Sequence, residues 1–198
     1  MIRVDCIQGS PEWLVARLVI PTGSRFSDVL TLKTRKLSAS ADKYALELCA
    51  EWLLGEPLDA ASSQFMQRGS PLESEARDWY SLMYDVDIEQ VGFVLRDDRH
   101  VGCSPDGLIS NDGVLEIKCL SAREHVAALL NKADEYTMQV QGQMWLCERT
   151  HAIRLYYHPA MPPVVQRVQR VERDDGLIAD LAEAIDGFCD RLHAMQTQ

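Results

Sequence analysis

The sequence lacks long apolar runs, a signal peptide and closely spaced cysteines. No apolar stretch approaches the roughly 20 residues that cross a bilayer, and residues 1–10 contain neither an apolar core nor a small-residue cleavage site. The sequence contains no Cys-x-x-Cys pair, which argues against a structural zinc site or an iron–sulfur cluster. The six cysteines are Cys6, Cys49, Cys103, Cys119, Cys147 and Cys189. We therefore expect a cytoplasmic protein with no membrane partner, whose cysteines are reduced and buried.

Disorder, a collagen-like structure and a disulfide scaffold are also excluded, because 46% of the 198 residues are apolar and 25% are charged. This length predicts one domain that spans residues 1–198. The net charge of −10 argues against a protein that coats nucleic acid nonspecifically. Residues 17–36 nevertheless hold five basic side chains against one acidic side chain. A small basic feature on an acidic protein is typical of an enzyme that binds a polyanion at one place.

Apolar periodicity and capping residues predict helices in several parts of the chain. Ser10 as N-cap and Pro11 in the first turn favour a short helix, and Ser24 is placed to cap a second one. Because proline interrupts a helix, we expect the segment 62–84 to break at Pro71. The other predicted helices are 40–54, which stops at Gly55, and 122–131, 135–147 and 174–195.

From residue 89 onward the apolar period changes from about 3.6 to 2, which predicts strands. Pro105 cannot donate a hydrogen bond to a neighbouring strand, so a bulge or a sheet edge is expected there. The predicted strands are 89–96, 100–109, 114–120, 151–157 and 164–171. Strands interspersed with helices predict a mixed α/β fold, in which helices cover the faces of the sheet.

Two carboxylates and a lysine are the candidate catalytic residues. Glu116 and Lys118 are two residues apart in one predicted strand, so their side chains project from the same face. If Asp106 shares that face, the two carboxylates can bind Mg²⁺, which takes its other ligands from water and phosphate. The metal would acidify a water, and the ammonium would orient it or stabilise developing charge. The same spacing also occurs in a solvated hairpin with a weak surface ion pair.

The turn between the two predicted strands decides which side chains share a face. A three-residue loop with Gly113 in the left-handed conformation would pair Ser110 with Val114 and bring Asp106 to the face of the other two. A two-residue turn would shift the pairing by one and send Asp106 to the opposite face. We expect the three-residue loop, or a bulge at Pro105 that restores the same parity.

Four blocks of the sequence resemble the phage λ exonuclease family of viral-type alkaline exonucleases. This family belongs to the restriction-endonuclease-like superfamily, whose signature is Asp-x(n)-Glu-x-Lys on a hairpin. The blocks are Arg17-Leu18 with Thr22-Gly23-Ser24, Arg68-Gly69 with Glu73 and Glu75-Ala76, Cys103 to Leu108 with Leu115 to Cys119, and Tyr136 to Gln141 with Met144-Trp145. They occur in family order. The resemblance implies a central mixed β-sheet flanked by helices in a single domain.

The resemblance also implies a metal centre. Asp106 and Glu116, together with the backbone carbonyl of Ile117, are implied as ligands of the main metal ion. Glu73 is implied as a ligand of a second ion. From the sequence without the resemblance, Glu73 could equally be an ordinary carboxylate on the surface of a helix. The expected cofactor is Mg²⁺, for which Mn²⁺ could substitute, with one or two ions in each active site.

Further residues take their expected roles from the same resemblance. Lys118 is implied to activate or position the attacking water, and Gln139 to orient the water or the phosphate. Arg17, Ser24 and Ser104 match a pocket for a terminal 5′-phosphate. The chemistry suits this role, because a guanidinium binds phosphate through a fork of donors and hydroxyls add further hydrogen bonds.

Contacts to the DNA outside the catalytic centre are expected from two segments. Lys33, Arg35 and Lys36 form a predicted exposed basic loop that would contact the duplex backbone, unless it is simply solvated. The side chain of Met66, just before the second block, would act as an apolar wedge between the strands, unless it packs in the core. The acidic C-terminal helix shows no motif, and we expect it to serve packing or a partner surface.

The resemblance implies a Mg²⁺-dependent 5′→3′ exonuclease that acts on double-stranded DNA. It would release 5′-mononucleotides and leave 3′ overhangs for recombination by annealing. It further implies a homotrimeric ring, a single-strand annealing protein as partner, and a phage or prophage gene expressed in a bacterial host. Two alternatives remain open at this point: a restriction-type DNA endonuclease of the same superfamily, and a non-catalytic DNA-binding module.

Overall fold

The computed structural model describes residues 1–58, 62–130 and 136–197, with residues 62–70 described by their backbone alone. The side chain of Met66, a predicted DNA contact, therefore lies outside the described residues. The helices are α1 (Pro11–Arg17), α2 (Ala41–Leu54), α3 (Ser62–Tyr84), α4 (Ala122–Leu129), α5 (Thr137–Leu146), α6 (Asp175–Gln196) and the short 3₁₀ helices η1 (Gly23–Asp28) and η2 (Pro163–Val165). The strands are β1 (Ile2–Val4), β2 (Leu30–Thr31), β3 (Lys36–Leu37), β4 (Ile88–Glu89), β5 (Phe93–Leu95), β6 (Gly102–Cys103), β7 (Gly107–Ile109), β8 (Gly113–Cys119), β9 (His151–Tyr157) and β10 (Arg167–Glu172).

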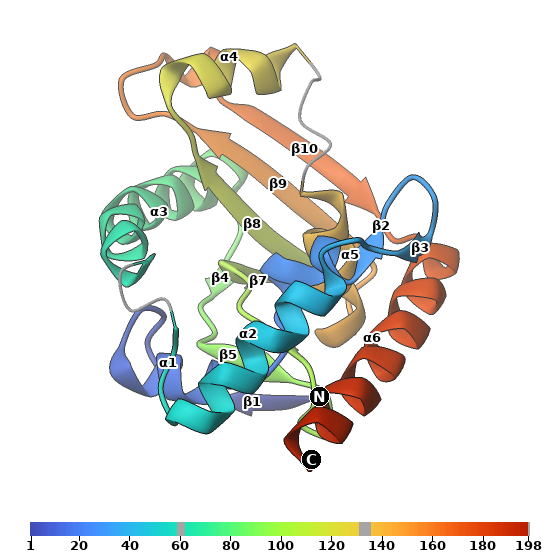
Figure 1. Cartoon of the computed structure of the whole chain (residues 1–198). Helices are drawn as coiled ribbons and strands as arrows, with labels where there is room; N and C mark the ends of the chain where they lie inside the picture. Colours follow the sequence, from blue (N-terminus) through green and yellow to red (C-terminus); the bar gives the residue numbers. More distant parts are fainter. Residues whose placement is uncertain (59–61, 131–135, 198) are drawn as a thin grey trace.

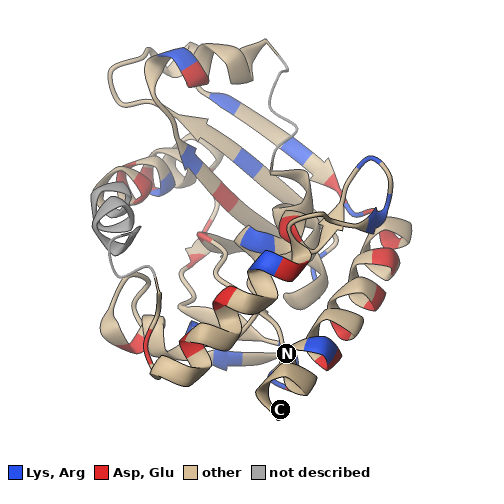
Figure 2. Cartoon of the chain, viewed as in Figure 1, with Lys and Arg blue, Asp and Glu red and all other residues tan. Residues whose placement is uncertain are grey.

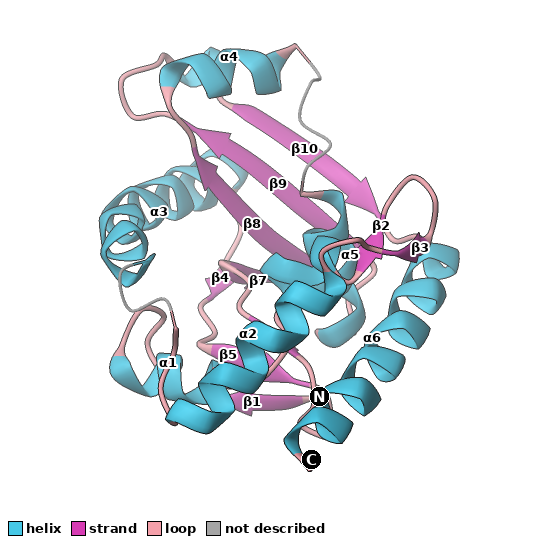
Figure 3. Ribbon diagram, viewed as in Figure 1, coloured by secondary structure: helices cyan, strands magenta, loops and turns pink. Residues whose placement is uncertain are grey.

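A mixed sheet of five strands, in the order β10-β9-β8-β7-β4, forms the centre of the fold (Figure 1). β8 and β9 run parallel, whereas the other neighbouring strands are antiparallel. α3 packs against β8, and α5 packs against both β8 and β9, while α6 packs on α5 and α2 on α6 (Figure 3). A smaller sheet, β1-β5-β6, and the ribbon β2-β3 complete the structure. The protein is thus a mixed α/β single domain, as predicted.

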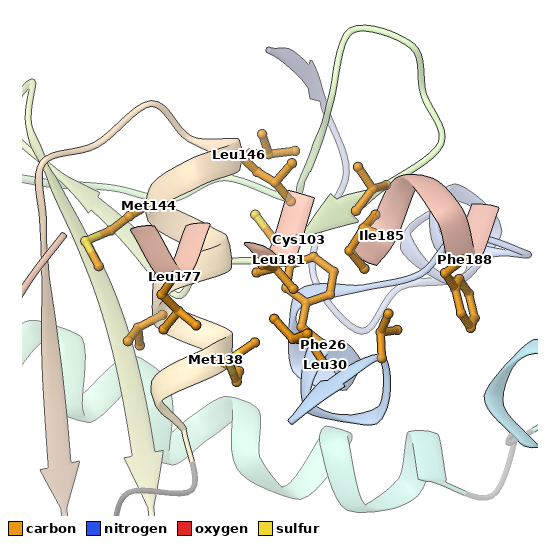
Figure 4. Packing of buried hydrophobic residues seen from close by; sticks show 14 of the residues in the cluster. Phe26, Leu30, Cys103, Met138, Met144, Leu146, Leu177, Leu181, Ile185 and Phe188 are labelled. Atoms are coloured by element: carbon orange, nitrogen blue, oxygen red, sulfur yellow. The ribbon is translucent and has the colours of Figure 1, made fainter. Parts of the chain in front are cut away.

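Two apolar clusters hold helices on opposite faces of the central sheet. In β8, Val114 belongs to the cluster under α5, whereas Leu115 and Ile117 belong to the cluster under α3. Figure 4 shows side chains of the first cluster from α5 and α6, among them Met138, Met144, Leu177 and Leu181. Because alternate residues of a strand face opposite sides, this pattern places Glu116 and Lys118 on the α5 face.

The hairpin between β7 and β8 has the predicted three-residue loop, but a different register. Ile109 pairs with Gly113, so the predicted pairing of Ser110 with Val114 is wrong. Ser110, with φ of +50°, takes the left-handed conformation in place of Gly113, because Gly113 already pairs with the first residue of β9. The register differs from the prediction by two residues, which leaves the parity unchanged. Asp106 therefore stays on the predicted face.

Several predicted strands are shorter than expected. The segment 89–96 divides into β4 and β5, which belong to different sheets, and 164–171 divides into η2 and β10. At Gly92 the chain passes so close to Cys6 that an added Cβ would overlap the Cys6 carbonyl, which explains the bend between the two sheets. The segment 100–109 divides into β6 and β7 around Pro105, where no N–H is available for pairing. Strands β1, β2 and β3 were not predicted.

The helix predictions are confirmed at two caps and wrong at two other positions. The Ser10 hydroxyl accepts a 3.2 Å hydrogen bond from the N–H of Trp13, and Gly55, with φ of +70°, ends α2. Ser24 lies inside η1 and is not its cap. Pro71 does not break α3, which continues through it, because packing of α3 on β8 offsets the one lost hydrogen bond.

None of the described helices is long and apolar enough to cross a bilayer. All six cysteines are free thiols, of which Cys103 and Cys147 are buried and the others are half-buried. Burial raises the pKa of Cys119 to about 12 and that of Cys189 to about 11. Since the thiolate is the reactive form, these cysteines are poor nucleophiles.

Candidate active site

Two carboxylates and an ammonium meet around β8. Asp106 immediately precedes β7, while Glu116 and Lys118 lie on β8 itself. The Nζ atom of Lys118 lies 2.7 Å from Oε1 of Glu116, whose side chain is 3% exposed. Oδ2 of Asp106 accepts a 2.6 Å hydrogen bond from the N–H of Ile117, in the same strand. The structure therefore brings the three predicted catalytic residues to one place.

Helix α5 presents two amide side chains to Glu116. Nε2 of Gln139 donates to Oε1 of Glu116 at 2.7 Å, and Oε1 of Gln139 accepts from Lys118 at 3.1 Å. Nε2 of Gln143 donates to Oε2 of Glu116 at 2.6 Å. Both carboxylate oxygens are therefore held by amides. Gln143 was not predicted. Because residues four apart on a helix share a face, the predicted position of Gln139 near the catalytic residues could have indicated the same position for Gln143.

Negative charge is in excess at this centre. Burial raises the pKa of Asp106 well above its ordinary value, and the carboxylates of Glu116 and Glu73 raise it further. Burial, followed by the charge of Glu116, also raises the pKa of Glu73. Burial lowers the pKa of Lys118, but Glu116 and Asp106 outweigh it and the net shift is upward. Lys118 thus faces the carboxylates of Glu116 and Asp106, and Glu73 adds a further carboxylate nearby, which favours the binding of a further cation.

A hard divalent cation fits these donors. The described residues contain no group of three His, Cys, Asp or Glu side chains that would hold a metal ion by themselves. The chain offers Asp106 and Glu116, with Glu73 on the wall of the same cavity. Mg²⁺ commonly takes one or two carboxylates and fills its other positions with water and substrate oxygens. The residues present therefore fit Mg²⁺, and the Ile117 carbonyl as a further ligand stays a prediction.

One cavity of about 560 Å³ connects the carboxylates with the predicted phosphate-binding residues. On the carboxylate side its walls include Glu73, Asp106, Glu116, Gln139 and Gln143. On the other side its walls include Arg17, Ser24 and Ser104. The two predicted sets come from segments far apart in the sequence, and a single ligand can contact both.

Trp13 contacts two of the predicted phosphate-binding residues in the cavity. Its indole N–H donates to the hydroxyl of Ser104 at 2.8 Å. The guanidinium carbon of Arg17 lies over the Trp13 ring, 3.9 Å from its centroid, and this cation–π contact holds the guanidinium at the ring. The hydroxyls of Thr22 and Ser24 lie 3.4 Å apart. Trp13 was not predicted, and its position one helical turn before Arg17 is the signal that could have indicated it.

Arg17 is a half-buried cation available to an anion. Burial lowers its pKa, although a guanidinium stays protonated in proteins. Within the described part of the chain, no carboxylate forms an ion pair with Arg17. Arg25, nearby in the sequence, is by contrast paired with Asp28 and Glu47. A phosphate in the cavity would therefore meet a charge that is not already neutralised.

The predicted basic loop is the β2–β3 ribbon and its turn. Lys33 and Lys36 are exposed there. The guanidinium of Arg35 instead binds two acids of the α6 region, with Nη2 3.2 Å from Asp174 and Nη1 2.9 Å from Asp180. In the cartoon of Figure 2, the acidic residues along α6 are coloured red. Arg35 thus has partners within its own chain, whereas the two lysines remain the better candidates for contact with DNA.

Comparisons with known proteins agree with this geometry. The YqaJ-like viral recombinase domain matches residues 12–150. The crystal structure of an alkaline exonuclease, LHK-Exo, from Laribacter hongkongensis is similar, with a TM-score of 0.84, 33% identity and 95% of both chains covered. The structure of LHK-Exo in complex with dAMP is similar to the same extent, with a TM-score of 0.83.

A phage-related exonuclease from Haemophilus somnus shares the fold, with a TM-score of 0.71 and 16% identity over 88% of this chain and 95% of the other. No curated protein matches the chain. Because the domain match covers most of the chain and LHK-Exo is 33% identical over nearly all of it, the chain belongs to the family of YqaJ-like viral recombinase domains, which confirms its resemblance to the phage λ exonuclease family.

Proposed function

We propose that the protein is a Mg²⁺-dependent exonuclease that degrades one strand of double-stranded DNA from its 5′ end. The observation that carries this proposal is the single cavity that contains both the carboxylate pair and the side chains of Arg17, Ser24 and Ser104. Family membership supports a nuclease of phage-type recombination. The relative LHK-Exo is an alkaline exonuclease, and one of its structures contains dAMP, which supports mononucleotides as the product.

The arrangement explains why cleavage would begin at a 5′ end. A terminal 5′-phosphate bound by Arg17 places the next phosphate of the strand toward Asp106 and Glu116, in the same cavity. Attack of water on that phosphorus, with departure of the 3′ oxygen, releases one 5′-mononucleotide. The shortened strand then carries a new 5′-phosphate, so each cut generates the group that the pocket binds. The other strand is left as a 3′ overhang, the substrate for annealing recombination.

Each catalytic side chain has a role that follows from its contacts. A Mg²⁺ ion at Asp106 and Glu116 supplies Lewis acidity to a water and a phosphate oxygen, and Mn²⁺ can replace it. Lys118 uses two N–H groups on Glu116 and Gln139, which leaves a third for the attacking water or a phosphate oxygen. Gln139, fixed by its own two contacts, holds this ammonium in place. Glu73 would serve a second metal ion.

The assembly is proposed from the family resemblance. A homotrimeric ring around the DNA would keep the substrate enclosed, and an acidic protein of net charge −10 would repel DNA from its outer surface. A single-strand annealing protein would take up the 3′ overhang. The proposed location is the cytoplasm of a bacterial host, with the gene on a phage or prophage.

Digestion of matched duplexes tests the proposed function. With Mg²⁺ present, we expect mononucleotides to be released from a linear duplex, at least about tenfold faster from a 5′-phosphorylated end than from a 5′-hydroxyl end. A charge-assisted hydrogen bond of about 1.5–3 kcal/mol accounts for this ratio. The released products are separated by chromatography and counted over time.

A closed circular duplex of the same sequence is the control, and it should stay intact. Cleavage of the circle would identify an endonuclease, and DNA binding without any hydrolysis would identify a non-catalytic DNA-binding module. Equal rates from the two kinds of end would remove the phosphate-binding role of Arg17, Ser24 and Ser104.

Trp13→Phe tests the organisation of the phosphate pocket. Phenylalanine keeps a ring beneath Arg17 but loses the hydrogen bond to Ser104. The loss of one hydrogen bond of about 0.5–1.5 kcal/mol should reduce the preference for a phosphorylated end by about three- to tenfold. Trp52→Phe, on the exposed face of α2, is the matched control and should leave the preference unchanged. An unaltered preference in Trp13→Phe would contradict the prediction.

A further inference from the structure

A second cavity of about 550 Å³ lies beside the first. Both cavities are lined by Gln8, Glu73 and Asp106. Of these two cavities, the residues of the phosphate pocket line the first and not the second, whereas Arg77 lines the second and not the first. Glu73 and Asp106, two of the predicted metal-binding carboxylates, therefore stand between two spaces, and the proposed function uses only one of these spaces.

Arg77 is anchored at the wall that the two cavities share. It follows Glu73 by four residues on α3, so the two side chains share a face of that helix. Nε of Arg77 donates to the backbone carbonyl of Asp106 at 2.9 Å. The positive charge of Arg77 opposes the rise in the pKa of Glu73 that burial causes, which agrees with this proximity. The guanidinium is thus held at its Nε edge.

Within the described part of the chain, the other edge of the guanidinium has no partner. Among the described residues, none accepts a hydrogen bond from either Nη group of Arg77, and no carboxylate forms an ion pair with it. Arg3 also lines the second cavity, but its Nη1 lies 2.6 Å from Glu89, which neutralises it. Asp5 is exposed at the same cavity. Arg77 is therefore the cation there that remains available to a ligand.

We propose that Arg77 binds the DNA phosphate that follows the scissile phosphate, so that the second cavity holds the strand on its 3′ side. This inference rests on the proposed function. If the terminal phosphate lies at Arg17 and the scissile phosphate at Asp106 and Glu116, the next phosphate falls on the side away from Arg17. The free Nη pair matches a phosphate in the bidentate arrangement that guanidinium groups adopt.

A purely structural role makes a different prediction. If Arg77 only holds the carbonyl of Asp106, its removal would displace a catalytic carboxylate and slow hydrolysis. DNA binding without metal would then be unchanged. If Arg77 binds phosphate, its removal weakens DNA binding even when no metal is present and no hydrolysis occurs.

The test measures binding of a fluorescent, 5′-phosphorylated duplex in EDTA by anisotropy. In one version of the duplex, an uncharged methylphosphonate replaces the phosphate between the second and third nucleotides of the 5′ strand. We expect this change to weaken binding by wild type about tenfold, which corresponds to a charge-assisted hydrogen bond of roughly 1.5 kcal/mol. Arg77→Met should bind the unmodified duplex about tenfold more weakly and should not respond to the methylphosphonate.

Two controls keep the inference open to contradiction. Arg170→Met removes an exposed arginine that is paired with Glu172 and lines neither cavity, and it should bind both duplexes as wild type does. Arg77→Lys keeps the charge without the fork and should recover part of the lost affinity. Thermal unfolding shows whether each variant is folded. The effect of the methylphosphonate on binding by wild type tests the inference even if a variant does not fold.

The inference is overturned if wild type binds both duplexes equally, or if Arg77→Met still responds to the methylphosphonate. It is also overturned if Arg77→Met binds like wild type and only its hydrolysis is slower, since this is the structural role. Failure of the proposed function is a separate result, because it appears as cleavage of closed circles or as absence of hydrolysis by wild type in Mg²⁺.

Discussion

Lys118→Met is expected to lower the rate of DNA hydrolysis by about 10³-fold, within the range that general acid–base and electrostatic groups contribute. Methionine has a similar length and volume but carries no charge and donates no hydrogen bond. The ammonium is placed for catalysis by Glu116 and Gln139 at 2.7 and 3.1 Å. The ring of Tyr136, whose centroid lies 4.3 Å from Nζ, faces it as well.

The fold should tolerate this substitution. Glu116 keeps a donor on each carboxylate oxygen, because Gln139 and Gln143 remain. We therefore expect affinity for DNA in EDTA to change by less than about tenfold, which separates the loss of chemistry from a loss of binding. A burst of product followed by a slow phase would be absent, since the chemical step itself is slowed.

The measurement is a single-turnover digestion of 5′-phosphorylated duplex by wild type and Lys118→Met. Lys43→Met is the matched control, because Lys43 is an exposed lysine of α2 whose Nζ lies 3.7 Å from Glu47. Surface pairs of this kind contribute little, so its rate should equal that of wild type. A Lys118→Met rate within tenfold of wild type would contradict the assignment.

Asp106→Asn is expected to make the metal-free protein more stable and at the same time inactive. Asp106 is a carboxylate whose pKa is raised by burial and by Glu116 and Glu73, so its ionised form is disfavoured in the folded state. Asparagine removes that repulsion and can still accept the hydrogen bond from Ile117. A gain of about 1 kcal/mol raises Tm by about 2–4 °C in a domain of this size.

The sign of the pH dependence follows from the raised pKa. Below the unfolded pKa, Asp106 is protonated in both states. As pH rises toward its folded pKa, the folded state holds a proton that the unfolded state has released, so wild type loses stability. Glu73 acts in the same direction, because its pKa is also raised. The Tm advantage of Asp106→Asn over wild type should therefore grow as pH rises through this window.

Binding of Mg²⁺ should reverse this difference. The metal binds the ionised carboxylate, so its binding displaces the proton and strengthens with rising pH. We expect Mg²⁺ to raise the Tm of wild type, increasingly so as pH rises through the same window, and to leave Asp106→Asn almost unchanged. Asp42→Asn, at an exposed side chain of α2 paired with Arg191, is the control and should respond to Mg²⁺ as wild type does. A variant less stable than metal-free wild type throughout this range would contradict the prediction.

The catalytic strand was predictable because its chemistry is local. Side chains alternate along a strand, so Glu116 and Lys118 share a face in any strand that contains both. The position of Asp106 depended on the turn, and the predicted register was wrong by two residues. The predicted face of Asp106 was nevertheless correct, because a shift of the register by an even number of residues leaves each side chain on the same face of the sheet.

Other elements were missed because their cause is not local. The segment 89–96 has a continuous strand pattern, yet it divides between two sheets where Gly92 crosses Cys6. Strand β1 could not be predicted from its own three residues, because it forms by pairing with β5, about 90 residues away in the sequence. The sequence predicted Arg35 as an exposed cation that contacts DNA, but its guanidinium binds Asp174 and Asp180, which lie 139 and 145 residues away in the sequence. Charge partners over such separations depend on packing.

By itself, the sequence determined the family, the mixed α/β class and the identity of the central residues Asp106, Glu116 and Lys118. The α/β class follows from periodicity, which short-range geometry controls, whereas the family and the three residues follow from the resemblance of four sequence blocks to the phage λ exonuclease family. Only the tertiary structure decided that the carboxylates and the predicted phosphate-binding side chains line one cavity. It also decided that Trp13, Gln143 and Arg77 are the neighbours that hold them. Such contacts are made by side chains on separate elements, and their distances are set by how helices pack on the sheet, which no local pattern encodes.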